Sequence, residues 1–175
     1  MRDPLADARS LVPRVYAYVA YRLGDGPDAE DVTSRVFERA LQYRHSWDHT
    51  RGEPIAWLIG IARRCIEDGR HDPRLVSLDG VDLATSGSFE EETVARLELQ
   101  SAIETLSLRD RELIALRYGA DLNSRQIAAA LGLSSAAVRV ALHRALERLR
   151  GCLSDESAPS AIPLRGTLVA PEEAR

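Results

Sequence analysis

The chain has 175 residues, 45% of them hydrophobic and 29% charged, with a formal net charge of −4. This length and composition suit one medium core or two small ones and exclude a chain that is disordered over most of its length. Because the net charge is negative, contact with nucleic acid requires a local basic patch. The sequence shows neither a run of about 18 apolar residues nor a leader in which basic residues precede apolar ones. We therefore expect a cytoplasmic protein with no membrane insertion.

Helical spacing of apolar residues predicts three helices in the N-terminal part, near residues 11–23, 27–41 and 55–69. Gly24 ends the first pattern, and Pro27 suits the first position of the second helix. We therefore expect residues 1–70 to form one small helical domain. Trp57 and Cys65 of the third helix are predicted to lie in its core.

Periodicity stops after the third helix, where proline, glycine, serine and acidic residues predict a flexible acidic linker over residues 71–92. Helical spacing resumes over residues 93–151, and Ser107 with Asp110 resembles a capping pair that opens a further helix. The tail, residues 152–175, contains three prolines and is expected to be mobile. The predicted fold class is therefore all-α, with two small helical domains joined by a flexible linker.

The segment from Asn123 to Arg150 has the pattern of a helix-turn-helix. Asn123 and Gln126 are expected to cap the first helix, Gly132 to leave it with a positive φ, and Leu133 to fill the gap between the helices. Ser134 is expected to cap the second helix. The predicted buried contacts come from Ile127, Ala128, Leu131, Val138 and Leu142.

The second helix of this pair carries Arg139 and His143 on one face, opposite Val138 and Leu142. Residues 99–151 hold eight arginines against five acidic residues, so the positive excess is concentrated here. A face of arginine and short polar residues fits the major groove of DNA. The alternative is an ordinary solvated face on a helical hairpin.

Three stretches taken together resemble the extracytoplasmic-function sigma factors of bacterial RNA polymerase. "DAEDVTSRVFERAL" is similar to the family's polymerase-binding helix, and "RGEPIAWLIGIARR" to its promoter-melting segment. "LSLRDRELIALRY" followed by "NSRQIAAALGLSSAAVRVALHRALERLR" is similar to the domain that reads the upstream promoter element. A single helix-turn-helix identifies a family weakly, whereas these stretches in the family's order identify it strongly.

The resemblance implies a sigma factor that binds core RNA polymerase and reads the minus-35 and minus-10 promoter elements. The resemblance further implies that the protein is not an enzyme and uses no cofactor, metal or small-molecule substrate. Its partners would be core polymerase, promoter DNA and an anti-sigma factor. The implied polymerase contacts are Asp31, Arg35 and Glu38. The implied minus-35 contacts are Arg125, Ser134, Ser135, Arg139, His143, Arg144 and Arg148. The implied minus-10 contacts are His49, Arg51, Arg63 and Arg64, around the loop that captures the melted strand.

The sequence departs from the family's pattern in places. Ile59 and Gly60 stand where the family usually has Tyr-Arg, and Arg64 replaces an asparagine. The basic-Ser-Arg triplet of the recognition helix is here Arg139-Val140-Ala141, which predicts a different promoter sequence. Ser34 and Arg35 replace a Gln-Glu pair on the polymerase-binding helix.

Two other functions compete with this interpretation. One is a stand-alone helix-turn-helix regulator that acts on duplex DNA without polymerase, which would leave residues 5–69 without a role. The other is a metallohydrolase that uses His45, Asp48, His49 and His71. These histidines lie in loop sequence without the spacing of a zinc site, so they are expected to be solvated.

Overall fold

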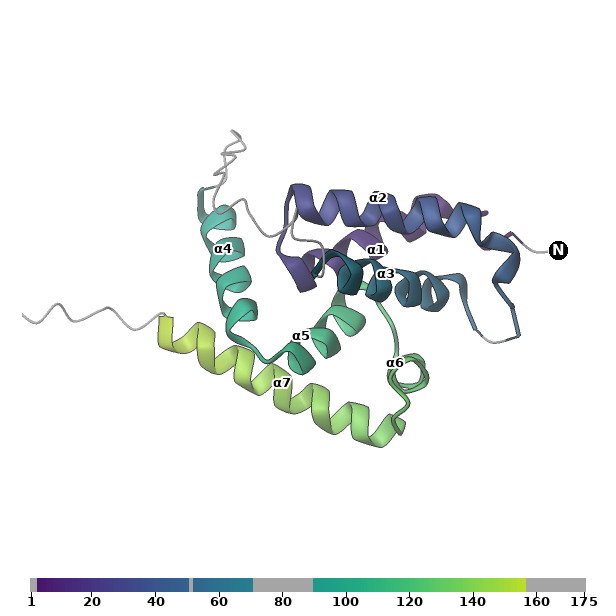
Figure 1. Cartoon of the computed structure of the whole chain (residues 1–175). Helices are drawn as coiled ribbons and strands as arrows, with labels where there is room; N and C mark the ends of the chain where they lie inside the picture. The colour runs from purple at the N-terminus through teal and green to yellow at the C-terminus, as the bar shows by residue number, and fades with distance from the viewer. Residues whose placement is uncertain (1–2, 51, 71–89, 157–175) are drawn as a thin grey trace, which may run out of the picture.

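The computed structural model describes residues 3–50, 52–70 and 90–156, and every regular element in these ranges is a helix (Figure 1). The predicted all-α fold class is therefore confirmed. The N-terminal unit comprises α1 (Ala8–Leu23), α2 (Pro27–Gln42), the short 3-10 helix η1 (Arg44–Ser46) and α3 (Pro54–Arg70).

The helix boundaries of the N-terminal unit follow from its glycines and prolines. Gly24 ends α1 at φ 95°, a conformation that glycine adopts at no steric cost. Pro27 occupies the first turn of α2, where its missing N–H is no loss. Between α2 and α3, Arg39 Nη1 donates to Asp68 Oδ2 at 2.8 Å and ties the two helices together. The three predicted helices of this unit are all present.

The C-terminal unit comprises α4 (Glu90–Thr105), α5 (Leu108–Ile114), the π-helical turn η2 (Ala115–Gly119), α6 (Ser124–Leu131) and α7 (Ser135–Glu156). Ser107 caps α5 as predicted, because its side chain accepts a hydrogen bond from the Asp110 N–H at 3.2 Å. The π-helical turn was not predicted, because widening of a helical turn leaves the apolar spacing almost unchanged.

The helix-turn-helix forms largely as predicted. Asn123 and Gln126 make a reciprocal capping box at the start of α6. Gly132 ends α6 at φ 66°, and Ser134 Oγ accepts from the Ala137 N–H at 3.1 Å at the start of α7. The two helices meet at 102°. The prediction for Leu133 was wrong: its side chain is 37% exposed and does not fill the gap, which Ile127 and Val138 already fill from α6 and α7.

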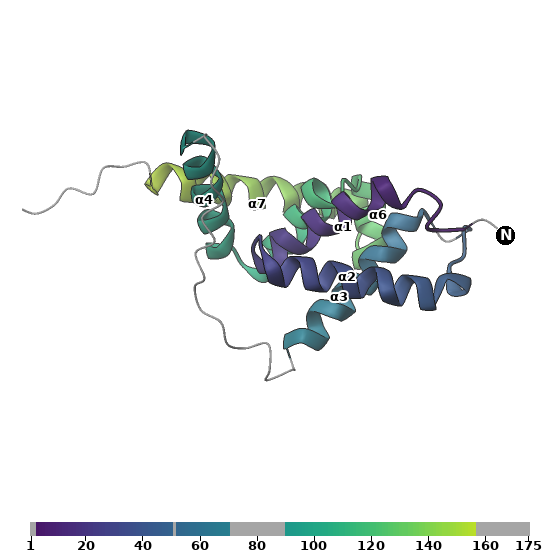
Figure 2. The ribbon, with the colours of Figure 1, turned by 90° about the horizontal axis from the view of Figure 1, so that it is seen from above.

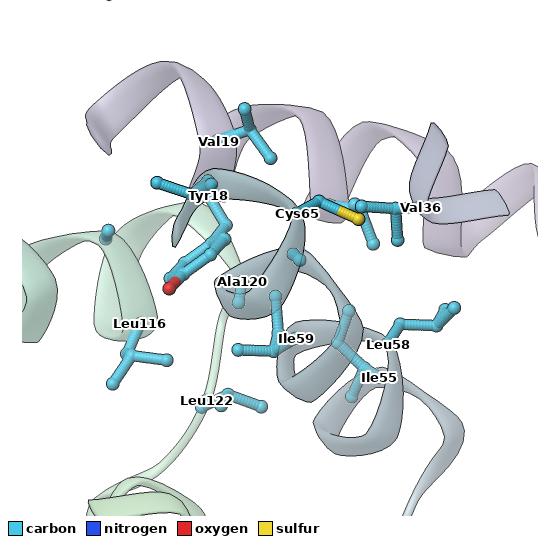
Figure 3. Packing of buried hydrophobic residues seen from close by; sticks show 14 of the residues in the cluster. Tyr18, Val19, Val36, Ile55, Leu58, Ile59, Cys65, Leu116, Ala120 and Leu122 are labelled. Atoms are coloured by element: carbon cyan, nitrogen blue, oxygen red, sulfur yellow. The ribbon is translucent and has the colours of Figure 1, made fainter. Parts of the chain in front are cut away.

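The main hydrophobic core is shared between the two units. It joins Tyr18 and Val19 of α1 and Ile59 of α3 to Leu116 of η2 and Leu122, which precedes α6 (Figure 3). A smaller cluster joins α4, α5 and α7 within the C-terminal unit. Figure 2 shows α1 lying between α2 and the helices of the C-terminal unit. The two helical units are therefore docked on one another.

The linker and tail predictions concern residues 71–92 and 152–175, most of which lie outside the described residues. The end of the predicted linker overlaps α4, which begins at Glu90, and the start of the predicted tail continues α7 to Glu156. Within the described ranges, no single helix is long and apolar enough to cross a membrane, and only the bent pair α6 and α7 passes that test jointly.

Candidate nucleic-acid interface

The first half of α7 presents basic side chains to solvent. Arg139, His143 and Arg144 are all exposed, while Val138 and Ala145 on the opposite side are fully buried. His143 Nε2 lies 3.3 Å from Glu147 Oε1, one turn further along the helix. Packing of the buried side therefore fixes the orientation of the helix and leaves the basic face free to enter a groove.

The residues around the turn of the helix-turn-helix differ in exposure. Arg125, in the first turn of α6, is exposed. Ser134 is exposed, but its hydroxyl oxygen is used to cap α7, and Ser135 is half-buried. A hydroxyl that accepts from the backbone can still donate its own hydrogen to a phosphate.

Arg148 has another partner within the protein. Its guanidinium makes two hydrogen bonds to Asp110 of α5, at 2.9 and 2.7 Å. This pair joins α5 to α7 and lies one turn beyond His143 and Arg144. Arg148 thus takes part in a contact between helices, although its side chain is 52% exposed and follows Arg144 by one turn of α7.

A cavity of about 670 Å³ lies between the start of α1 and the loop that joins α2 to α3. This volume is within the range of roughly 300–1,000 Å³ that is usual for ligand pockets. Trp47 and His49 line it on the loop side, and Asp7 and Ser10 line it on the α1 side. The loop predicted to capture a melted strand thus borders a hollow that can receive an unstacked base.

Trp47 was missed by the sequence reasoning, although the signal was present. Its ring centroid lies 6.4 Å from that of His49, with 57° between the ring planes. An aromatic residue in a polar loop is an available stacking surface for a base. Trp57, by contrast, packs partly buried against the main core, as predicted.

The predicted minus-10 arginines do not share one environment. Arg64 is exposed on α3. Arg63 Nε lies 3.4 Å from Glu112 Oε1, and its Nη1 donates to the Ala130 carbonyl at 3.3 Å, so this side chain is turned toward the C-terminal unit. Arg51 lies outside the described residues. Of this group, His49 borders the cavity.

The predicted polymerase-binding residues lie along the outer side of α2. Asp31 and Glu38 are exposed, and Arg35 is half-buried with its Nε donating to the Asp31 carbonyl at 3.4 Å. Spacings of four and three residues place all three on one side of the helix. The opposite side, with Val32 and Val36, packs into the core.

The metal-site alternative finds no support in the described part of the chain, where no three His, Cys, Asp or Glu side chains gather to hold an ion. His45 and His49 are exposed, and His71 lies outside the described residues. Cys65 is buried as predicted, and burial raises the pKa of its thiol.

Comparison with known proteins matches both units to sigma-factor families. Residues 8–72 match the family model of sigma-70 region 2, and residues 96–149 match that of sigma-70, region 4. Neither is a classical enzyme family. The chain is 30% identical over 148 residues to the ECF RNA polymerase sigma factor SigL of Mycobacterium tuberculosis, covering 81% of this chain and 83% of SigL. It is 27% identical over 152 residues to BldN of Streptomyces coelicolor, another ECF RNA polymerase sigma factor, covering 82% of this chain but only 57% of BldN.

Solved structures give the same fold. The sigma factor RpoE of Bartonella quintana, determined with the anti-sigma factor NepR, superposes with a TM-score of 0.63 at 22% identity, covering 85% of this chain and 94% of RpoE. CnrH, determined with the cytosolic domain of CnrY, superposes with a TM-score of 0.61 at 27% identity, covering 86% of each chain.

The sequence matches, the two family models and the helix-turn-helix geometry agree. The chain belongs to the extracytoplasmic-function sigma factors of bacterial RNA polymerase.

Proposed function

We propose that the protein binds core RNA polymerase in the cytoplasm and directs promoter-specific initiation by reading the minus-35 and minus-10 elements. The observation that carries the proposal is the exposed basic face of α7. The opposite side of α7 is buried, and this packing holds the helix at 102° to α6. Membership of the sigma-factor family supports a role for this surface at promoters.

The minus-35 contacts are assigned to the entry of α7. Arg139 and Arg144 supply guanidinium groups that can pair with guanine edges or with phosphates, and His143 lies between them in sequence. Arg125 and the Ser134 hydroxyl are assigned to phosphates at the edge of the groove. Arg148 is the weakest assignment, because its guanidinium is already paired with Asp110.

The minus-10 contacts are assigned to the loop after α2 and its cavity. Trp47 offers a stacking surface, and His49 borders the same hollow. Exposed Arg64 would attract the backbone of the separated strand. Arg63 can join them only after it leaves Glu112.

The polymerase contact is assigned to Asp31, Arg35 and Glu38 on the outer side of α2, which the core leaves accessible. Binding and strand separation need no bond-making chemistry from the protein, so we propose no enzymatic activity and no cofactor. An anti-sigma factor is proposed as the inhibitory partner, because the sigma factor RpoE, which shares this fold, was determined with the anti-sigma factor NepR.

Run-off transcription with purified core polymerase and a promoter library tests the proposal. We expect transcripts from a defined promoter subset only when both the protein and core polymerase are present. An electrophoretic mobility shift assay distinguishes a sigma factor from a stand-alone regulator. The regulator would bind promoter duplex tightly without polymerase and would support no transcript. Trp47→Ala is expected to reduce strand opening, measured by permanganate reactivity of unpaired thymines, with polymerase binding unchanged.

A further inference from the structure

The basic face of α7 has exposed apolar residues at its centre. Val140 is 51% exposed, and Ala136, one turn earlier, is also exposed. Val138 is two residues away and therefore lies on the opposite side of the helix, where it is fully buried. In Figure 1, α7 forms the lower edge of the molecule, and α4, α5 and α6 pack against it from above. Val140 thus points away from the packed side of α7.

Basic side chains flank Val140 on both sides. Because an α-helix has about 3.6 residues per turn, His143 and Arg144 lie one turn beyond Val140, one to each side of it. Both are exposed, as is Arg139, the residue before Val140. His143 Nε2 lies 3.3 Å from Glu147 Oε1, toward the next turn of the helix. This face of α7 therefore has an apolar centre and basic flanks.

The neighbours of Val140 distinguish it from an ordinary exposed valine. A single exposed apolar residue needs no explanation in a folded protein. Val94 of α4, for example, is 53% exposed, with Leu97 and Glu98 one turn beyond it. Val140 instead lies among side chains that are attracted to phosphates. That attraction would draw this face of α7 into a groove of DNA and bring Val140 against the edges of the bases.

The chemistry of the base edges decides which base suits a valine. In the major groove, a G·C pair presents hydrogen-bond acceptors and a donor, whereas an A·T pair also presents the 5-methyl group of thymine. The valine side chain has no polar atom. Against a G·C edge it would displace water from polar groups without replacing the lost hydrogen bonds, which is unfavourable. Against thymine, its methyl groups meet another methyl group.

The helix geometry limits this apolar contact to one or two base pairs. Ala136 and Val140 are four residues apart, which is about 6 Å along the helix axis. This distance is less than two base-pair steps of about 3.4 Å. Ala136 has no side-chain atom beyond Cβ, so this turn of α7 can approach the bases closely. The longer side chains of Arg139 and Arg144 can meanwhile reach guanine edges or phosphates beside the contact.

We propose that Val140 reads the 5-methyl group of a thymine in the minus-35 element, and that Ala136 lets this turn of α7 reach the floor of the major groove. The inference rests on the proposed function and adds to it one base that the element contains. A hydroxyl at this position could form hydrogen bonds with several bases. Valine discriminates among bases through its shape and its lack of polar groups, so Val140 is a specificity-determining residue.

Replacing thymine with uracil in the promoter tests the contact, because it removes the 5-methyl group and keeps the hydrogen-bonding groups of the base. Each thymine in the minus-35 element of a promoter found by run-off transcription is replaced in turn. Footprinting with the holoenzyme measures the apparent affinity. For the wild type, we expect one replacement to weaken the affinity about fourfold, the change that corresponds to one buried methyl group.

Val140→Ala removes the protein side of the same contact. This variant should bind the unmodified promoter about fourfold more weakly, and uracil at the sensitive position should then change its affinity by less than about 1.5-fold. Circular dichroism should show unchanged helix content, because alanine favours the helix more than valine does. Val94→Ala makes the same substitution at a similarly exposed position of α4 and is the matched control. It should keep the uracil sensitivity of the wild type.

Three results would overturn the thymine contact while the proposed function stands. They are promoter-dependent transcription from minus-35 elements without thymine, no effect of any uracil replacement, and an equal uracil effect in the wild type and Val140→Ala. The third result would leave the Val140 side chain to solvent or to a protein partner. Absence of any promoter-dependent transcript would instead refute the proposed function, and the thymine contact with it.

Discussion

Arg148 of α7 binds Asp110 of α5 through two parallel hydrogen bonds, Nε to Oδ2 at 2.9 Å and Nη2 to Oδ1 at 2.7 Å. Asp110 is 7% exposed and also accepts from Ser107 Oγ at 2.8 Å. A bidentate pair of this kind fixes the plane of the guanidinium as well as its position. The end of α5 nearest its N-terminal cap is therefore held against the middle of α7.

Asp110→Ala should destabilise the C-terminal unit. It removes the acceptor for both Arg148 and Ser107, and loss of a partially buried hydrogen-bonding partner costs about 1–3 kcal/mol in the free energy of unfolding. Urea denaturation followed by circular dichroism measures the change. Glu98→Ala, on the exposed side of α4, is the control and should stay within about 0.5 kcal/mol of the wild type.

The same pair predicts an acid sensitivity. Burial alone would raise the pKa of Asp110, but the hydrogen bonds from Arg148 and Ser107 outweigh it and hold the pKa below its ordinary value. Because the folded pKa is lowered, the stabilisation is fully present above about pH 4 and is lost as the pH falls through the lower folded value. Asp110→Asn should flatten this part of the stability curve. An unchanged slope in that variant would assign the acid sensitivity to other carboxylates.

Replacing Arg139 and Arg144 with alanine should abolish promoter-specific transcription and leave polymerase binding intact. Each base or phosphate contact is worth about 1–3 kcal/mol, so the double variant should lose at least tenfold in promoter occupancy. Footprinting with the assembled holoenzyme measures occupancy, and pull-down measures polymerase binding. Arg150→Ala, exposed further along α7, is the matched control. Parallel loss of polymerase binding would contradict the assignment.

Charge reversal on the outer side of α2 should weaken association with core polymerase. Asp31→Lys and Glu38→Lys alter exposed side chains whose helix is anchored by its opposite side, so folding should be retained. Biolayer interferometry with immobilised core polymerase is expected to show at least a fivefold weaker affinity, about 1 kcal/mol for a desolvated charge contact. Glu98→Lys makes the same charge change on α4 and should bind normally. Equal affinities for all three variants would remove α2 from the contact.

The Tyr18 hydroxyl should lose its proton at a higher pH than the hydroxyl of a free tyrosine. Burial raises its pKa to about 12, against the opposing influence of Arg22 and Arg63. The raised folded pKa means that its contribution to stability is complete below about pH 10 and is lost as the pH rises from there to about 12. The difference in tyrosinate absorbance between the wild type and Tyr18→Phe isolates this group. A difference curve centred near pH 10 would show that Tyr18 is not buried against Glu112 in solution.

Local features of the fold could be predicted from the sequence because each one is encoded within a few residues. Asn123 with Gln126, Gly132 and Pro27 specify helix ends through their own hydrogen bonds or backbone angles. The docking of the units could not be predicted in this way. It depends on pairs such as Tyr18 and Glu112, which are 94 residues apart and show no pattern in the chain between them.

The residues of the candidate site also fall into two groups: those whose environment could be predicted from the sequence, and those whose environment could not. Arg139 and His143 could be predicted from helical spacing, because four residues make about one turn and neither residue has a place in the core. Arg63 and Arg148 fit the family's pattern equally well, but their environments depend on Glu112 and Asp110 of another helix. Sequence identifies a cation, whereas tertiary packing decides whether that cation faces DNA or a carboxylate.

Helix α7 continues without a break for 22 residues, so its N-terminal tip, which carries the basic face, and its C-terminal base tilt together as one rigid rod. The helix is about 33 Å long, so a tilt of about 6° at the base displaces the tip by about 3.4 Å, the rise of one base pair. Ala145 and Leu149 set the angle of the base through the smaller apolar cluster. Substitutions in this apolar cluster can therefore change promoter preference, although none of the substituted residues contacts DNA.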